Sequence, residues 1–470
     1  MYSINSSSDT ICALSTANGM GAIAVIRVSG KDALAIGSAV FSKKLDDVLS
    51  HTAHFGTLKA ENDELIDEVL ITVFQGNKSF TGEPTIEIAC HGSTYIQQQI
   101  LQLLVRKGCR LAAPGEFTFR AFMNGKMDLS QAEAIADLIH SESKKAHDLA
   151  ILQMKGKFSS ELKELRDKLI HFASLVELEL DFADEDVEFA DRTELKQLVK
   201  EVLAYIERLI QSFELGNAIK NGVPVAIVGA PNTGKSTLLN QLLKEDRAIV
   251  SSIAGTTRDV IEETLNIDGI LFRLIDTAGI REQAEEIEAL GIEKSKEKIK
   301  QAQIVVLMSD AAIDFSKELG HNAMPTADAV EWGKTLKQEF PSKKIIVIAN
   351  KIDLSSVDLT PYTNENVNII GISAKSGIGI EELQQWMVTQ IQEGFDITQE
   401  TIITNARHVA ELTAASTALQ QALNGLETNI TGDFIAMDIR QAMYRLGSIT
   451  GQISEDDILG NIFSKFCIGK

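Results

Sequence analysis

The 470-residue chain contains only four cysteines, and no two of them form a C-x-x-C pair. Zinc ribbons and disulfide-rich extracellular domains are therefore not expected. We expect the cysteines to be reduced and the protein to hold no structural zinc. No apolar run reaches the roughly 18 residues that a membrane-spanning helix needs. Residues 1–9 also lack the basic and apolar regions of a signal peptide. Together these absences predict a cytoplasmic protein without a transmembrane segment.

Positive charge is scarce as well, because 45 lysines and arginines face 66 acidic residues and the formal charge is −21. Sequence-independent nucleic-acid binding depends on neutralising phosphates, so this balance argues against it. Any contact with RNA would need a local basic patch or a partner protein. The most acidic stretch, residues 181–194, is interpreted as a solvated connector rather than a binding site.

One glycine-containing segment indicates nucleotide chemistry. Residues 229–236 read G-A-P-N-T-G-K-S, which matches the phosphate-binding pattern G-x-x-x-x-G-K-[ST]. A strand-like run (223–228) precedes the segment and a helix-compatible run (237–243) follows it, so backbone N–H groups would face the phosphates. Lys235 is expected on the β- and γ-phosphate oxygens, and the Ser236 hydroxyl on Mg²⁺.

Further motifs indicate that the base is guanine. Asn350-Lys351-Ile352-Asp353 follows an apolar run, and the Asp353 carboxylate can accept from guanine N1–H and the exocyclic amine. Ser373-Ala374-Lys375 suits a loop behind the base. Asp276-Thr277-Ala278-Gly279 suits the Mg²⁺ side and the γ-phosphate, and Thr256-Thr257 can supply a second Mg²⁺-binding hydroxyl, that of Thr257. The predicted GTP-binding residues are Asn232, Thr233, Gly234, Lys235, Ser236, Thr237, Ser251, Ser252, Ile253, Ala254, Gly255, Thr256, Thr257, Asp276, Thr277, Ala278, Gly279, Asn350, Lys351, Asp353, Ser373, Ala374 and Lys375.

The hydrolytic machinery departs from that of many small GTPases. There, a glutamine two residues after the position of Gly279 orients the attacking water, whereas this chain has Ile280 and Arg281. Another group must therefore place the water and offset the charge that develops on the phosphoryl group. The acidic side chains that follow are candidates, although a solvated acidic segment is the better interpretation for any single one of them. These residues are Glu282, Glu285, Glu286 and Glu288.

The hydrophobic pattern predicts a multidomain α/β protein. Residues 1–120 mix strand-like runs, such as 68–74 and 85–89, with a helix-like run at 95–107, which suits an α+β domain. Helical stripes follow, and a Ras-like P-loop GTPase domain is expected to be inserted among them, which makes the helical domain discontinuous. The helices before and after the insertion should then pack together. The predicted boundaries are 1–120 for the α+β domain, 121–216 for the first helical segment, 217–385 for the GTPase domain, and 386–470 for the second helical segment.

Two other regions could carry chemistry. The Glu83 carboxylate with the cations Arg27 and Lys126 could hold a small ligand that bears both positive and negative groups. A surface turn with charged residues at strand ends is the commoner explanation for such residues. The C-terminal Cys467-Ile468-Gly469-Lys470 has prenylation spacing but poor residues for it in its last two positions. A free thiol there could instead reach an active site, and simple burial is the ordinary alternative.

With these motifs in place, essentially the whole chain resembles the MnmE (TrmE) family of tRNA-uridine-modifying GTPases. Other GTPases share the nucleotide motifs but not the two ends of the chain. The markers of the resemblance are Asp9-Thr10-Ile11, Arg27-Val28-Ser29-Gly30, Ser79-Phe80-Thr81-Gly82-Glu83, Ala113-Pro114-Gly115-Glu116-Phe117-Thr118, Asp128-Leu129-Ser130-Gln131-Ala132-Glu133-Ala134, Gly255-Thr256-Thr257-Arg258-Asp259 and Cys467-Ile468-Gly469-Lys470.

The resemblance implies a reaction and partners. Members act with a flavin-dependent partner, MnmG (GidA), in a complex of the heterotetramer type. They add an aminomethyl or carboxymethylaminomethyl group to C5 of the wobble uridine (position 34) of certain tRNAs. A folate, 5,10-methylene- or 5-formyl-tetrahydrofolate, supplies the one-carbon unit to the folate-binding-like N-terminal domain, which also forms a homodimer. The resemblance places Arg27, Glu83, Lys126 and Lys470 at the folate and makes Cys467 the functional thiol of the tail.

The resemblance also implies how GTP is hydrolysed without the glutamine. Family members are potassium-activated, and Asn232 matches their potassium-binding asparagine. Backbone oxygens near Ser251, Ile253 and Thr256 would complete that site, and K⁺ there can stabilise transition-state charge. Glu288 matches the family's water-orienting glutamate, so the implied catalytic residues are Lys235, Glu288 and Cys467. Residues 16–21 and 91–94 depart from the family pattern. These departures affect what the resemblance implies about details of the folate pocket and of dimerisation.

Three other classes of function remain alternatives from the sequence. A ribosome-assembly or stress GTPase would be expected to carry a basic RNA-binding module, which the acidic helical remainder does not supply. A folate-dependent aminomethyltransferase without energy coupling would have no use for five nucleotide motifs. A third alternative is a scaffold that recruits the flavin enzyme and performs no chemistry, and the sequence alone does not distinguish it from a tRNA-modifying GTPase.

Overall fold

The computed structural model describes residues 9–181, 192–246, 263–275, 296–312, 324–354, 358–362, 367–392, 400–428, 430–453, 459, 462–463, 466 and 469. Contacts divide the chain into two compact units. The first comprises Met1–Ile139, Ile151–Leu203 and Glu411–Lys470, and the second comprises His140–Ala150 and Ala204–Ala410. The domain boundaries expected from the sequence stay predictions.

The first unit begins with a six-stranded sheet in the order β3-β4-β5-β2-β1-β6. All neighbouring strands are antiparallel except β1 and β6. Side chains alternate between the two faces of each strand, so Ala24, Ile26 and Val28 of β2 point into the core that α1 and α2 cover, while Arg27 points to the other face. The elements are β1 (Ile11–Leu14), β2 (Ile23–Ser29), α1 (Ala33–Val40), β3 (Thr52–Lys59), β4 (Leu65–Phe74), η1 (Gly76–Lys78), β5 (Thr85–His91), α2 (Thr94–Arg106) and β6 (Arg110–Leu111).

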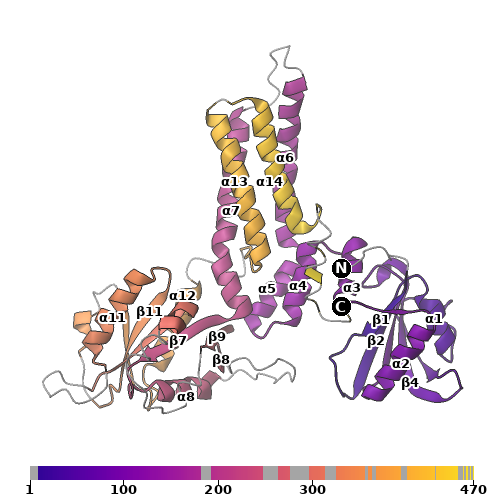
Figure 1. Ribbon diagram of the computed structural model, residues 1–470, viewed down its shortest axis with the longest axis horizontal. Coiled ribbons are helices and arrows are strands. Elements are labelled where there is room, and N and C mark those ends of the chain that lie inside the picture. Colours follow the sequence, from indigo (N-terminus) through magenta and orange to yellow (C-terminus); the bar gives the residue numbers. More distant parts are fainter. Residues whose placement is uncertain are drawn as a thin grey trace. The chain divides into compact units, whose positions relative to one another are not determined.

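Helices make up the remainder of the first unit, and three helices, α5, α7 and α13, have residues in both units. Helix α14, from the C-terminal region of the chain, runs along α6, which precedes the nucleotide motifs (Figure 1). This contact confirms that helices on either side of the insertion pack together. The helices are α3 (Glu116–Met123), α4 (Leu129–Ile139), α6 (Lys157–Asp181), α7 (Arg192–Asn221), α13 (Ala406–Glu427) and α14 (Gly432–Thr450).

The second unit contains a six-stranded sheet in the order β12-β11-β10-β7-β9-β8, in which only the edge strand β8 is antiparallel to its neighbour. Both faces are covered, because Val223, Val225 and Ile227 of β7 enter one core while Ala226 and Val228 enter the other. Its elements include α5 (Lys144–Met154), β7 (Val223–Gly229), α8 (Lys235–Asp246), β8 (Glu263–Ile267), β9 (Ile270–Leu274), β10 (Ile304–Asp310), α11 (Thr326–Glu339), β11 (Lys344–Asn350), η3 (Thr360–Tyr362), β12 (Asn368–Ile372) and α12 (Ile380–Gln392).

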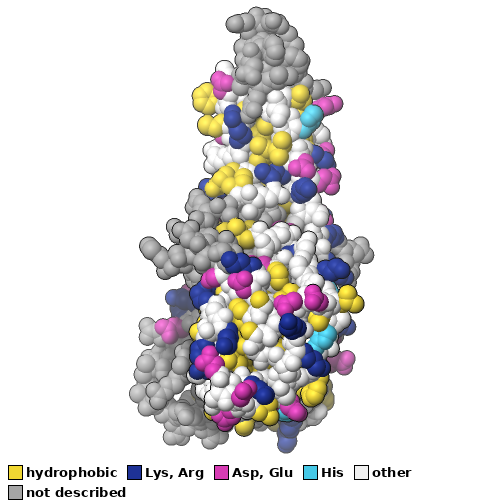
Figure 2. All heavy atoms as spheres, turned by 90° about the vertical axis from the view of Figure 1, so that its right-hand side faces the viewer, with side chains coloured by type: hydrophobic (Ala, Val, Ile, Leu, Met, Phe, Trp, Pro, Cys, Tyr) yellow, Lys and Arg dark blue, Asp and Glu magenta, His cyan; other side chains and the backbone are white. Residues whose placement is uncertain are grey.

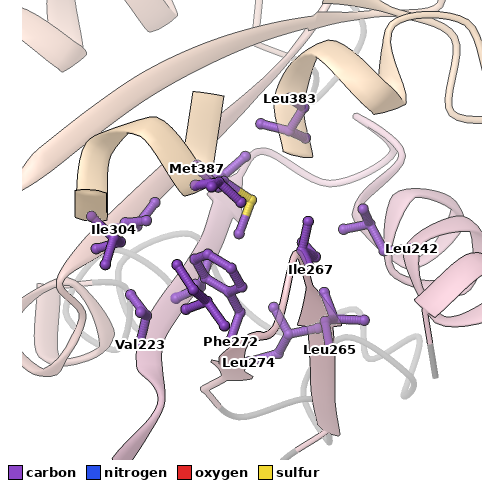
Figure 3. Packing of buried hydrophobic residues seen from close by; sticks show 14 of the residues in the cluster. Val223, Leu242, Leu265, Ile267, Phe272, Leu274, Ile304, Leu383 and Met387 are labelled. Carbon is purple, nitrogen blue, oxygen red and sulfur yellow. The ribbon is translucent and has the colours of Figure 1, made fainter. Parts of the chain in front are cut away.

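The core on one face of this sheet draws on helices that are distant in sequence. Figure 3 shows Phe272 of β9 with Val223 of β7 and Met387 of α12 in one buried cluster. Ala146 and Leu149 of α5 enter the same cluster. The structure thus confirms the predicted multidomain α/β class, with an α+β region, helices and a Ras-like parallel sheet. Within the described ranges, none of the helices is apolar over a stretch long enough to span a bilayer.

Candidate functional site

The phosphate-binding segment joins β7 to α8, at the carboxyl edge of the parallel sheet. Gly234 adopts φ +98°, and a Cβ added there would lie 2.2 Å from Asn350 Nδ2. Only glycine therefore allows the loop to lie this close to the segment that follows β11. Strand, loop and helix occur where the sequence predicts them.

Lys235 begins α8 and folds back over the loop. Its Nζ donates to the carbonyl oxygens of Gly229 (2.9 Å) and Ala230 (2.8 Å). Burial lowers the pKa of this ammonium group, and the positive charge of Lys298 lowers it further. An anionic phosphate placed at the loop would oppose both effects, so the site is electrostatically prepared for a negative ligand.

A single buried amide links the phosphate loop to the predicted base side. Asn350 Nδ2 donates to the carbonyl of Thr233 (2.8 Å), and its Oδ1 accepts from the backbone N–H of Ala374 (3.0 Å). The segment 373–375 is therefore held against the loop through one side chain at the end of β11. The structure brings these predicted residues together, whereas Asp353 and Lys375 are exposed beside them.

Lys351 has a partner that the sequence did not reveal. Its Nζ lies 2.5 Å from Asp310 Oδ2, and the Asp310 side chain is only 8% exposed. Asp310 ends β10 and pairs in register with Asn350 at the end of β11. Parallel strands bring their carboxyl ends to one edge, which is why residues 41 positions apart meet there.

Several predicted site residues lie outside the described residues of the chain. They are Ser251, Ser252, Ile253, Ala254, Gly255, Thr256, Thr257, Asp276, Thr277, Ala278, Gly279, Glu288, Cys467 and Lys470. Among the described nucleotide-site residues, Asn232, Ser236 and Thr237 are exposed, and Asn232 has φ +61°.

A second cluster of charge lies on the N-terminal sheet. Arg27 donates through Nε and Nη2 to Glu87 Oε1 (2.9 and 2.8 Å). Its guanidinium lies over the rings of Phe80 and Phe117, 5.4 and 5.6 Å from their centroids. The cation is thus fixed between two aromatic side chains on the face of the sheet that α1 and α2 leave uncovered.

Glu83 and Lys126 flank the turn next to Arg27. The Glu83 carboxylate accepts from Ser29 Oγ (2.9 Å), and Ser29 is two residues from Arg27 on the same face of β2. Lys126 Nζ donates to the Asn77 carbonyl (2.7 Å), and its stem passes Gly82, where an added Cβ would lie 3.5 Å from Lys126 Cδ. All three predicted residues are therefore gathered in one region.

The described residues of the C-terminal tail reach this same region. The carbonyl oxygen of Gly469 accepts from Ser15 Oγ (3.2 Å) and from Arg27 Nη1 (3.4 Å). Gly469 has φ +97°, and a Cβ there would lie 2.1 Å from the Leu14 carbonyl oxygen, so only glycine fits at this position of the tail. Phe466 is buried in a small aromatic cluster with Phe463.

Charges of both signs are mixed over the described surface shown in Figure 2. Lys and Arg side chains alternate there with Asp and Glu, and the described residues form no broad basic field on that face.

The parallel sheet, the glycine loop entering α8 and the asparagine that ties it to the base side define a P-loop nucleotide hydrolase. Family models match residues 10–126 as "GTP-binding protein TrmE N-terminus" and residues 129–467 as "MnmE helical domain". The chain belongs to the MnmE family of tRNA modification GTPases, and it is a GTP hydrolase of tRNA modification.

Proteins named tRNA modification GTPase MnmE are similar to this chain over its full length. That of Flavobacterium johnsoniae is 52% identical over 98% of this chain and 99% of the relative. That of Cytophaga hutchinsonii is 52% identical over 99% of both chains, and that of Parabacteroides distasonis is 52% identical over 98% and 100%. The FeoB G-domain of Methanococcus jannaschii aligns with 36% of this chain and 98% of its own at 20% identity, with a TM-score of 0.25.

Proposed function

We propose that this GTPase, together with the flavin-dependent partner MnmG, adds an aminomethyl or carboxymethylaminomethyl group to C5 of the wobble uridine of certain tRNAs. A folate one-carbon unit supplies the methylene. The observation that carries this proposal is the convergence of Arg27, Glu83, Lys126 and the Gly469 end of the tail on one region of the N-terminal unit. A simple switch GTPase has no use for such a second, charge-lined region.

The N-terminal region has the chemistry that a tetrahydrofolate needs. Arg27 and Lys126 are cations for the glutamate carboxylates of 5,10-methylene- or 5-formyl-tetrahydrofolate. The Glu83 carboxylate can accept from N–H groups of the ligand's heterocycle. We place Lys470 near the same ligand and Cys467 as the thiol that the tail brings to it, since Gly469 lies at Arg27.

For GTP hydrolysis, the proposed residues divide by task. Ser236 and Thr257 hold Mg²⁺, and Asn232 holds K⁺ with oxygens of the segment that contains Ser251, Ile253 and Thr256. Asn232 suits this role because it is exposed in the loop, in a left-handed conformation that asparagine tolerates. When bound, these cations supply positive charge beside the transferred phosphoryl group. Glu288 orients the attacking water in place of the absent glutamine.

Potassium should therefore accelerate hydrolysis by the purified protein. We expect steady-state kcat to be at least about tenfold higher in KCl than in NaCl at equal ionic strength, since the cation acts as an electrostatic stabiliser of the transition state. Asn232→Ala should abolish the difference while leaving the slow rate in NaCl in place. Equal rates in the two salts for the unmodified protein would contradict the potassium role and leave the missing glutamine unexplained.

The partners follow from the same proposal. The substrate is tRNA, and the reaction takes place in the cytoplasm with MnmG in a heterotetramer-type complex. A homodimer through the N-terminal domains is supported by an apolar row on the outer sheet face, where Phe55 (60% exposed) pairs with Leu70 (42% exposed) and Leu70 pairs with Ala89. Exposed apolar rows of this kind favour association.

A further inference from the structure

One buried guanidinium joins three carboxylates beside the proposed folate region. The Arg120 side chain is 7% exposed and lies on α3. It donates through Nη2 to Asp9 Oδ1 (2.7 Å) and Glu116 Oε1 (3.0 Å), and through Nη1 to both Glu83 oxygens (3.3 Å each). An arginine is suited to this geometry, because its planar fork can serve several acceptors at once and an ammonium group cannot.

A second arginine, Arg110, pairs with two of these carboxylates. Arg110 donates to Asp9 Oδ2 (2.6 Å) and to Glu116 Oε1 and Oε2 (2.5 and 3.0 Å), but it makes no hydrogen bond to Glu83 among the described contacts. Burial raises the pKa of Asp9, and hydrogen bonds from Arg110 and Arg120 outweigh this effect and lower the pKa. Burial also raises the pKa of Glu116, and hydrogen bonds from Arg110 and the Ala113 backbone N–H, with the positive charges of both arginines, lower it overall. Both carboxylates are thus held ionised.

Glu83 is the carboxylate of this network with spare accepting capacity. Its contacts with Arg120 are the longest in the cluster, and three carboxylates share two guanidinium groups. On its other side it accepts from Ser29, which belongs to a buried group of hydroxyls with Thr81 and Thr85. An ionised carboxylate offers about four acceptor positions, so Glu83 can still bind donors of a ligand.

We propose that Arg120 is the positioning residue of the ligand site: it holds the Glu83 carboxylate in the orientation that accepts N–H donors of the bound heterocycle. This inference rests on the proposed folate function of the same region. The Asp9 and Glu116 carboxylates hold the Arg120 guanidinium, and Ser29 limits the rotation of Glu83 from the opposite side.

The test is a double-mutant cycle on binding of 5-formyl-tetrahydrofolate to the full-length protein, measured by calorimetry. Arg120→Gln should weaken binding at least about tenfold, because a buried charged partner of Glu83 is lost. Arg110→Gln is the matched control: it removes the same charge from Asp9 and Glu116 but spares Glu83, so its effect should stay below about threefold. In a Glu83→Gln background, Arg120→Gln should change folate binding by less than about threefold, because the effects of substituting two coupled residues are not additive.

Two results would overturn the inference. If the losses for Arg120→Gln and Glu83→Gln multiply, or if Arg110→Gln matches Arg120→Gln, Arg120 does not act through Glu83. If the unmodified protein binds no folate, the proposed function itself is wrong, and the inference falls with it. Thermal unfolding of each variant checks folding, and Arg120→Lys, which keeps the charge but not the fork, replaces Arg120→Gln in the same cycle if that variant fails to fold.

Discussion

Gly234→Ala is expected to lower kcat/KM for GTP hydrolysis by about 10²-fold or more. The new Cβ would lie 2.2 Å from Asn350 Nδ2, and the backbone at φ +98° disfavours any side chain. The loop would have to move away from Asn350, which breaks the hydrogen bond from Asn350 to Thr233. Backbone N–H groups that face the phosphates would move with it, and losing one preorganised donor in a catalytic site typically lowers the rate by about 10²–10³-fold.

Gly377→Ala is the matched control for this variant. Gly377 also has a positive φ, +85°, but an added Cβ would meet only the flexible end of Gln241, at 3.3 Å. It should therefore retain hydrolysis within about threefold, because it carries the backbone strain without the collision. Steady-state hydrolysis and binding of a fluorescent GDP analogue measure both variants. A Gly234→Ala protein with wild-type kinetics would show that the close contact with Asn350 does not shape the phosphate site.

Asp353→Asn is expected to exchange guanine for xanthine specificity. The carboxylate accepts from N1–H and the exocyclic amine of guanine, and charge-assisted hydrogen bonds of this kind contribute about 1.5–3 kcal/mol each. Asparagine places an N–H₂ group against the guanine amine, so GTP affinity should fall by roughly 10²–10⁴-fold. Xanthine carries an oxygen at that position, and the amide can donate to it.

The measurement is competition binding of GTP and XTP to the variant and the unmodified protein. Because XTP binding should rise as GTP binding falls, the variant contains its own test of folding. Parallel weakening of both nucleotides would mean that Asp353 supports the loop rather than reading the base. The Asp353 side chain is exposed and follows the buried Asn350 in the same motif, which favours a role in recognising the base.

The regions of the structure that could be predicted are those that local sequence decides. The loop between β7 and α8, the strands β2, β4 and β5, and the long helices follow from apolar spacing and glycine placement. The short strands β1 and β6, with four and two residues, are too short to show a period. They form only because distant segments pair with them.

The residues that the sequence did not reveal owe their roles to contacts between distant parts of the chain. Arg120 is 37 residues from Glu83 and 111 from Asp9 along the chain. Asp310 meets Lys351 only through the register of two parallel strands. Gly469 reaches Arg27 across 442 positions. A motif reports the chemistry of its own segment, so partners of this kind need the folded chain.

The proposed tRNA modification is tested most directly by nucleoside mass spectrometry of tRNA after reaction with the full-length protein, the flavin-dependent partner, 5,10-methylene-tetrahydrofolate, an amine source and GTP in KCl. We predict an aminomethyl-type group at C5 of the wobble uridine in the complete reaction only. We also predict loss of the product when folate is omitted, and with Cys467→Ser while the complex still forms. Equal product without folate, or with Cys467→Ser, would contradict the chemistry assigned to the N-terminal region and leave the protein as a GTP-dependent scaffold.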